Sequence, residues 1–230
     1  FMGVRILIVE DDADINRLLE RILVKAGYDT TAAFSGSEAR LLKPQTFDLI
    51  LLDLMLPGAT GEELIAEIRQ SSTVPIIVIS AKGQEDKLNA LKSGADDFIA
   101  KPFDVEEVKV RVQSLLRRAR EFSSPAASGS RLVLGKLTLD PESREAEVEG
   151  KPLILTAREF DILALLLRYP NKVFTRQNLF ETVWGDDYLG DDNTINVHIS
   201  NLRSKLQKLD PKGEYIATVW GIGFKAGKRP

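Results

Sequence analysis

The stretch Phe47–Gly58, FDLILLDLMLPG, decides the fold. Its apolar run Leu49–Leu52 carries no charge, which is typical of a parallel strand buried on both faces. Asp53 stands where this strand ends, a few residues before the turn-forming pair Pro57-Gly58. Sites in open α/β sheets lie beyond the carboxyl ends of the strands. The stretch therefore predicts either a functional carboxylate at such an edge or an Asp that only caps a turn.

Strand-like and helix-like segments alternate on both sides of this stretch. Four other short runs, at residues 4–9, 28–33, 75–79 and 98–100, predict strands, and each strand is followed by a segment that predicts a helix. Alternation of this kind gives a parallel sheet with helices on both faces. Five strands in about 120 residues predict a flavodoxin-like α/β fold, a doubly wound five-stranded parallel sheet with the strand order 2-1-3-4-5.

This strand order brings chemically useful side chains to one edge of the sheet. Glu10, Asp11 and Asp53 would crowd three carboxylates together, which raises pKa values or demands a cation such as Mg²⁺. An Asp carboxylate can accept a phosphoryl group, for which Lys101 would offer a positive charge and Ser80 a hydroxyl donor. Each residue alone also fits a structural role, as a helix cap, a strand end or a solvated lysine.

The motifs ILIVEDD, LILLDLMLPG, VISA and GADDFIAKPF resemble the receiver domain of two-component response regulators. The resemblance implies that Asp53 is the phosphoacceptor. The metal-binding groups that it implies are Glu10, Asp11, Asp53 and the backbone carbonyl of Met55. The phosphate-binding and switch residues that it implies are Lys101, which precedes a cis Pro102, and the pair Ser80 and Phe98.

The second half of the chain has a different pattern. Residues 122–131, FSSPAASGSR, predict a flexible linker between a first domain at residues 1–121 and a second at residues 132–230. The second domain is expected to be α+β, with a small antiparallel sheet, three helices and a hairpin. The sheet is predicted at residues 132–154 and the hairpin at residues 215–225. The three helices are predicted to begin at Thr156, at Thr175 and near Asn193.

The third of these helices has two different faces. Its apolar residues recur at intervals of three and four from Ile195 to Leu209. Polar and basic side chains with the same spacing can contact base edges and phosphates; they are Thr194, His198, Asn201, Lys205 and Lys208. Basic residues are concentrated from Asn193 to the end of the chain, although an ordinary solvated helix face has the same pattern.

The motifs LTAREFDILALLLRYPNKVFTRQNLFETVWG, NVHISNLRSKL and TVWGIGFK resemble the winged helix-turn-helix effector domain of the OmpR/PhoB class. The resemblance implies that the third helix enters the DNA major groove, that the hairpin is the wing, and that the acidic loop at residues 185–192 faces RNA polymerase. The expected DNA-binding residues are Thr194, Asn196, His198, Asn201, Arg203, Lys205, Thr218 and Trp220. Trp220 stands where the family usually has a wing arginine. It either contacts DNA without a charge or packs on the third helix as core.

Composition narrows the classes of function. The chain has no cysteine, which excludes disulfides, thiolate zinc sites and thiol catalysis. Its one histidine, His198, lies far in the sequence from any Ser motif typical of a nucleophile, which argues against a Ser-His-Asp site. The net charge of −3 does not by itself indicate a nucleic-acid partner. Neither a signal peptide nor a membrane-spanning run is apparent, so we expect a cytoplasmic protein without a membrane partner.

Together the two resemblances predict a phosphorylation-regulated, DNA-binding transcription regulator. A histidine kinase would phosphorylate Asp53, which would promote formation of a homodimer and binding to promoter DNA, with direct-repeat half-sites. By the same resemblance, the dimer pairs across the two-fold axis would be Lys87 with Glu107, Asp97 with Arg111, and Asp96 with Arg118. No enzyme activity is expected beyond self-phosphorylation from a phosphodonor and slow self-dephosphorylation. The alternatives are a regulator that works without phosphate and a phosphohydrolase that uses Asp53 as a transient nucleophile.

Overall fold

The computed structural model describes residues 3–81, 83–121, 131–185 and 192–227, without the side chains of residues 117–121 and 192. The predicted linker therefore lies outside the described residues, except for Arg131. The chain divides into two units, residues 1–116 and residues 117–230, and each is described by itself. Within the described ranges, no helix combines the length and the apolar character that a membrane span requires.

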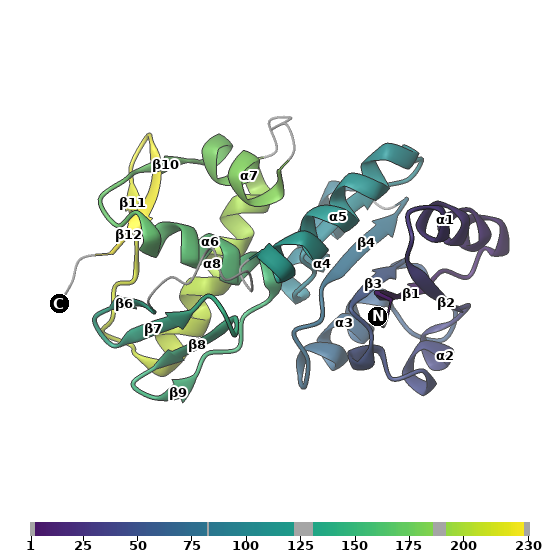
Figure 1. Ribbon diagram of the computed structural model, residues 1–230, viewed down its shortest axis with the longest axis horizontal. Helices are drawn as coiled ribbons and strands as arrows, with labels where there is room; N and C mark the ends of the chain where they lie inside the picture. Colours follow the sequence, from purple (N-terminus) through teal and green to yellow (C-terminus); the bar gives the residue numbers. More distant parts are fainter. Residues whose placement is uncertain (1–2, 82, 122–130, 186–191, 228–230) are drawn as a thin grey trace. The chain divides into compact units, whose positions relative to one another are not determined.

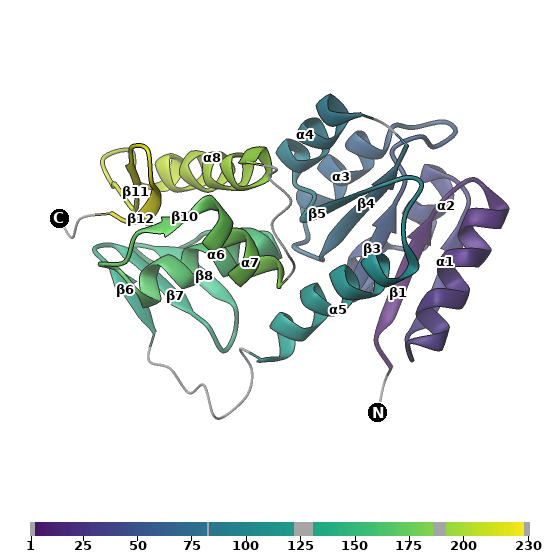
Figure 2. The ribbon, with the colours of Figure 1, turned by 90° about the horizontal axis from the view of Figure 1, so that it is seen from above.

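The first unit is a parallel sheet with helices on both faces (Figures 1 and 2). Its strand order, β2-β1-β3-β4-β5, confirms the prediction. The strands are β1 Arg5–Val9, β2 Asp29–Ala33, β3 Leu49–Leu52, β4 Ile76–Ser80 and β5 Asp97–Ala100. The helices are α1 Ala13–Lys25, α2 Gly36–Leu41, α3 Gly61–Arg69, α4 Gln84–Ser93 and α5 Val105–Glu121, with a short 3₁₀ turn at Pro44–Thr46. All of β3 and β4 is buried, because helices cover both faces of the sheet.

The register of the strands aligns their carboxyl ends along one edge of this sheet. Val9 of β1 lies beside Leu52 of β3, and Leu52 lies beside Val78 of β4. Ser80 at the end of β4 lies beside Ala100 at the end of β5. The residues that follow these strands therefore begin their loops along a single edge, where the sequence predicts the site.

The second unit combines two antiparallel sheets with three helices (Figure 1). The first sheet contains β6 Leu132–Leu134, β7 Leu137–Asp140, β8 Glu145–Val148 and β9 Lys151–Pro152, and the helices are α6 Ala157–Arg168, α7 Arg176–Trp184 and α8 Asp192–Leu209. The predicted hairpin is β11 Ile216–Val219 with β12 Gly223–Ala226, and we call these strands and their turn the wing. A two-residue strand, β10 Phe174–Thr175, pairs with β12 and was not predicted.

The core of the second unit explains why α8 is a helix. Its apolar residues Ile195, Ile199 and Leu202 belong to one buried cluster with the apolar residues of α6, α7 and both sheets. Thr156 and Thr175 cap α6 and α7 by accepting backbone N–H groups, and both helices begin where the sequence predicts. One face of α8 is thus fixed by packing against the rest of the unit.

Candidate functional site

Three carboxylates meet at the sheet edge of the first unit. Glu10 and Asp11 follow β1 and Asp53 follows β3, and one oxygen from each lies within 4.8 Å of the others. Glu10 and Asp53 are buried, with 2% and 5% of their surface exposed, whereas Asp11 is exposed. The N–H of Met55 donates to Oδ1 of Asp53 at 3.0 Å and orients this carboxylate. Oxygen-only donors at this spacing could hold a hard metal cation.

Lys101 reaches the carboxylates from the loop after β5. Its Nζ donates to Oε2 of Glu10 at 2.7 Å and to Oδ2 of Asp53 at 2.5 Å. Its backbone N–H donates to the carbonyl of Ser80 at 2.9 Å, and its peptide bond to Pro102 is cis, as the resemblance implied. A single ammonium group therefore bridges two buried carboxylates that come from different strands.

Burial and charge set the protonation of this pocket. Burial raises the pKa of Glu10, and the nearby Asp53 adds to the rise, although Lys101 opposes both. Burial alone would lower the pKa of Lys101, but its hydrogen bonds to Asp53 and Glu10 outweigh burial, and the pKa is raised. One ammonium group against three carboxylates leaves the pocket anionic, and an additional cation would stabilise it.

The two predicted switch residues are buried inside the first unit. Ser80 ends β4 and Phe98 lies in β5, with 0% and 7% of their surface exposed. Asn16 was not predicted as a site residue, and its Nδ2 donates to the carbonyls of Glu10 at 3.0 Å and of Ala33 at 3.5 Å. Asn16 thus holds the loop that presents the acidic pair. A polar residue within the buried face of α1 was the signal that could have revealed it.

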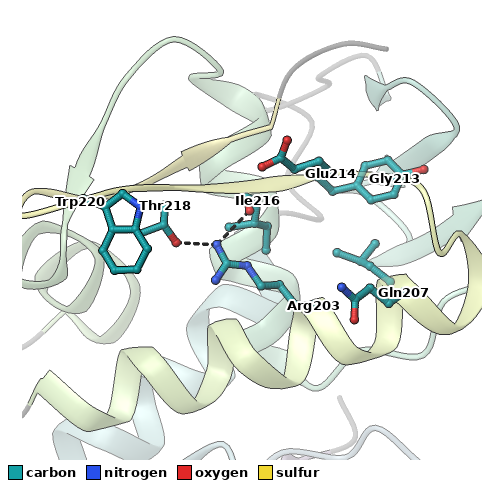
Figure 3. Close-up of a pocket in the computed structure, with 9 residues that line it drawn as sticks. Arg203, Gln207, Gly213, Glu214, Ile216, Thr218 and Trp220 are labelled. Carbon is teal, nitrogen blue, oxygen red and sulfur yellow. Dashed lines mark hydrogen bonds between the residues drawn. The ribbon is translucent and has the colours of Figure 1, made fainter.

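In the second unit, Arg203 joins α8 to the wing. Its Nη2 donates to the carbonyl of Ile216 at 2.9 Å and to Oγ1 of Thr218 at 2.8 Å (Figure 3). The guanidinium carbon also lies 5.9 Å from the ring centre of Phe224 in β12. Arg203 and Thr218, both predicted to contact DNA, are therefore engaged with each other within the unit.

A groove of about 310 Å³ lies between α8 and β11, and Arg203, Gln207 and Trp220 are among the residues that line it (Figure 3). Gln207 is exposed on α8 and was not predicted as a site residue. Trp220 is 89% exposed at the turn between β11 and β12. The alternative that Trp220 packs on α8 as core is therefore wrong.

Two protein families match the chain. The family described as "Response regulator receiver domain" matches residues 6–113, and "Transcriptional regulatory protein, C terminal" matches residues 150–226. The DNA-binding response regulator MtrA of Mycolicibacterium smegmatis is 39% identical over 98% of this chain and 98% of its own length. The alkaline phosphatase synthesis transcriptional regulatory protein PhoP of Bacillus subtilis is 39% identical over 97% of each chain.

Solved structures agree with these relatives. A RitR mutant superposes with a TM-score of 0.78 at 26% identity, covering 98% of this chain and 100% of that one. DrrB of Thermotoga maritima, described as an OmpR/PhoB homolog, gives a TM-score of 0.51 at 27% identity, covering 98% of this chain and 99% of that one. The chain belongs to the OmpR/PhoB class of response regulators. It is a transcription regulator of a two-component system, with a receiver domain and a winged-helix DNA-binding domain.

Several predicted DNA-binding residues of this response regulator have partners inside the effector domain. Nζ of Lys205 donates to Oε2 of Glu159 on α6 at 2.6 Å. Nε of Arg176 on α7 donates to Oδ1 of Asn196 at 3.1 Å. Asn201 is partly exposed. DNA contacts by Lys205, Asn196 and Asn201 stay predictions, and the geometry also gives Lys205 and Asn196 a role in positioning α8.

Two of the predicted DNA contacts are not on the surface of the response regulator. Thr194 and His198 have 3% and 1% of their surface exposed, and the ring centre of His198 lies 5.4 Å from that of Trp184. Side chains covered to this degree cannot reach a base edge in this conformation. We therefore correct both predictions. The spacing of polar residues along a helix does not distinguish a side that packs against protein from a side that faces solvent.

Residues of the predicted dimer surface form ion pairs within one chain. Arg111 lies 3.1 Å from Asp97 and 3.0 Å from Glu107. The charge of Asp97, aided by Glu107, raises the pKa of the Arg111 guanidinium, so this group stays charged. Lys87 is partly exposed on α4. In a dimer that uses the predicted pairs, Asp97 and Glu107 would have to bind a basic residue of the second copy as well as, or in place of, Arg111 of their own chain.

Asp96 does not fit its predicted place in a dimer of this response regulator. Its side chain is fully buried, and its Oδ2 accepts hydrogen bonds from Nη2 of Arg69 at 2.9 Å and from the N–H of Ile76 at 3.0 Å. The structure thus uses Asp96 to join α3 to the sheet, which argues against an exposed interface residue. The side chain of Arg118, its expected partner, lies outside the described residues, as do residues 186–191 of the acidic loop.

Proposed function

We propose that a phosphoryl group on Asp53, received from a histidine kinase, switches this response regulator. The observation that supports the proposal is Lys101, which places its ammonium group between Asp53 and Glu10 at the sheet edge. In the transfer, an oxygen of Asp53 bonds to phosphorus while the P–N bond of the donor phosphohistidine breaks, and the leaving imidazole takes up a proton. Lys101 then neutralises part of the charge on the new phosphoryl oxygens.

We infer that Mg²⁺ is the cation for the acidic group. Asp11, Asp53 and the carbonyl of Met55 would hold it beside Glu10, and when bound it supplies the positive charge that lets an anionic phosphodonor approach. The oxygen-only donor set and the burial that raises the pKa of Glu10 support this fit. Ser80 is expected to donate its hydroxyl to a phosphoryl oxygen, and Phe98, on the neighbouring strand, to change its packing in response.

The expected output is a dimer that binds promoter DNA in the cytoplasm. The two copies would meet through α4, β5 and α5, and a two-fold axis would make each of the pairs Lys87–Glu107 and Asp97–Arg111 occur twice. Exposed ion pairs contribute little affinity each, so these pairs would mainly fix the orientation of the copies. Helix α8 and the wing would read direct-repeat half-sites, and the loop at residues 185–192 would face RNA polymerase.

The test of this proposal compares two Asp-to-Asn variants. After treatment with acetyl phosphate and Mg²⁺, the wild type should gain one phosphoryl group by intact-mass spectrometry, and Asp53→Asn should gain none. Asp12→Asn is the matched control, because Asp12 caps α1 and Asn caps a helix equally well. An equal mass gain in Asp53→Asn would contradict the assignment. A phosphorylated wild type with unchanged self-association and unchanged DNA affinity would favour a regulator that works without phosphate.

A further inference from the structure

The tip of the wing is apolar and exposed. Trp220, at 89%, is the most exposed of the large apolar side chains in the part of the chain that the structure describes, and Ile222, two residues on, is 52% exposed. Between them, Gly221 adopts a φ of +75°, and the N–H of Ile222 donates to the carbonyl of Val219 at 3.0 Å to close the turn. An exposed indole forgoes the free energy of burial that it would gain against a partner. Residues 219–223 carry no charged side chain.

The wing holds the backbone that carries Trp220 in a fixed place beside α8. β11 pairs with β12 from Ile216 to Val219, and Arg203 ties the same strand to α8 through Thr218. Trp220 and the exposed Gln207 of α8 line one groove, so the indole and the helix border the same surface (Figure 3). A ligand that covers the exposed side of α8 therefore also meets Trp220.

The expected ligand of that surface is duplex DNA, and the rest of the inference depends on this proposed function. A helix fits the major groove of DNA. An element beside the helix then meets the adjacent sugar-phosphate strand and the minor groove beyond it. Apolar side chains contact DNA there by packing on sugars and base edges, without neutralising phosphate.

We propose that Trp220 packs its indole on the deoxyribose and base edges of the minor groove next to the half-site read by α8. The contact is apolar and carries no charge. Its contribution to affinity should therefore be independent of salt, unlike that of a lysine or arginine on a phosphate. It should also depend on the local width of the minor groove, which varies with sequence.

The test uses full-length phosphorylated protein and a fluorescein-labelled duplex that the wild type has selected from a random-sequence pool. Affinity is measured by anisotropy at several salt concentrations for the wild type and for Trp220→Ala, Trp220→Phe and Trp220→Arg. We expect Trp220→Ala to bind roughly tenfold more weakly at every salt concentration, with an unchanged slope of log affinity against log salt. Trp220→Phe should recover most of the affinity. Trp220→Arg should steepen the slope by about 0.9, the effect of one phosphate contact.

Tryptophan fluorescence gives a second, independent measurement. The chain has two tryptophans, and the other, Trp184, is 1% exposed. Acrylamide therefore quenches mainly Trp220 in the free protein. Acrylamide is uncharged, so DNA does not repel it. The selected duplex should reduce this quenching in the wild type to the low level of Trp220→Phe, which retains only Trp184.

The possible failures are distinguishable. The inference is overturned if Trp220→Ala binds as tightly as the wild type, if its slope becomes shallower, or if DNA leaves the quenching unchanged. It is also overturned if Trp220→Ala weakens self-association without DNA, because a second copy of the chain would then be the partner. If the wild type selects no duplex from the pool at low salt, the proposed function itself fails.

Discussion

Replacing Arg203 tests how the wing is held against the recognition helix. We predict that Arg203→Met lowers the free energy of unfolding of the effector domain by about 2–3 kcal/mol. The variant removes both hydrogen bonds of Nη2 and leaves the carbonyl of the buried Ile216 without this donor. A hydrogen bond from a charged group contributes about 1.5–3 kcal/mol. Two such bonds would together allow about 3–6 kcal/mol, and we take a value at or just below the lower end because Arg203 is only partly buried.

Tryptophan fluorescence can follow this domain in the intact protein, because both tryptophans, Trp184 and Trp220, lie in it. Urea unfolding would be measured for Arg203→Met, for Thr218→Val and for the double variant. Thr218→Val removes one of the two acceptors and should lower the free energy of unfolding by about 1 kcal/mol. The double variant should be less unstable than the sum of the single variants, because both remove the same bond.

One result would refute this reasoning. If Arg203→Met lowers the free energy of unfolding by less than about 0.5 kcal/mol and shows no coupling to Thr218→Val, Arg203 does not brace the wing. A large loss of DNA affinity in that same stable variant would then show that Arg203 acts on DNA directly, as the sequence predicts.

Two further variants test charged and polar pairs. Without metal, Lys101→Met should lower the free energy of unfolding by about 3 kcal/mol at neutral pH, because it leaves Glu10 and Asp53 buried without their cation. Burial raises the pKa of Glu10 and Lys101 opposes this rise, so the variant should raise that pKa further. A raised carboxyl pKa destabilises the folded protein as pH rises through it, so calorimetry should show a smaller loss of stability near pH 4 than at pH 7. A loss that is independent of pH would contradict this account. In the effector domain, the hydroxyl of Tyr215 donates to Oδ2 of Asp210 at 2.8 Å and lowers the pKa of that carboxyl. This bond stabilises the fold above the ordinary Asp pKa, and the stabilisation is lost as pH falls through the lowered pKa. Tyr215→Phe should therefore raise the pKa of Asp210 measured by NMR titration, and should lower the melting temperature at neutral pH only. An unchanged pKa of Asp210 would show that the hydrogen bond does not form.

The receiver pocket could be predicted from sequence because topology assembles it. Once the strands are parallel and ordered, Glu10, Asp53 and Lys101 must follow strand ends at one edge. The place of Asn16 on the buried face of α1 marks it as a buried polar group, but its partners could not be predicted, because they depend on which carbonyls lie opposite it in the folded loop. The strand β10 was also missed, because two residues are too short to show a period. Long periodic segments are thus predictable, whereas short pairings and single buried polar groups depend on tertiary neighbours.

The orientation of α8 shows where sequence reasoning reaches its limit. The apolar residues fix one face of the helix, but polar residues flank that face on both sides. On one side, Lys205 pairs with Glu159 of α6 and His198 packs near Trp184 of α7. On the other side, Arg203 is tied to the wing. Each side carries a basic residue, so charge cannot distinguish the side that packs inward from the side that is free to meet DNA. Only the positions of α6, α7 and β11 decide, and these are set by contacts far apart in the sequence.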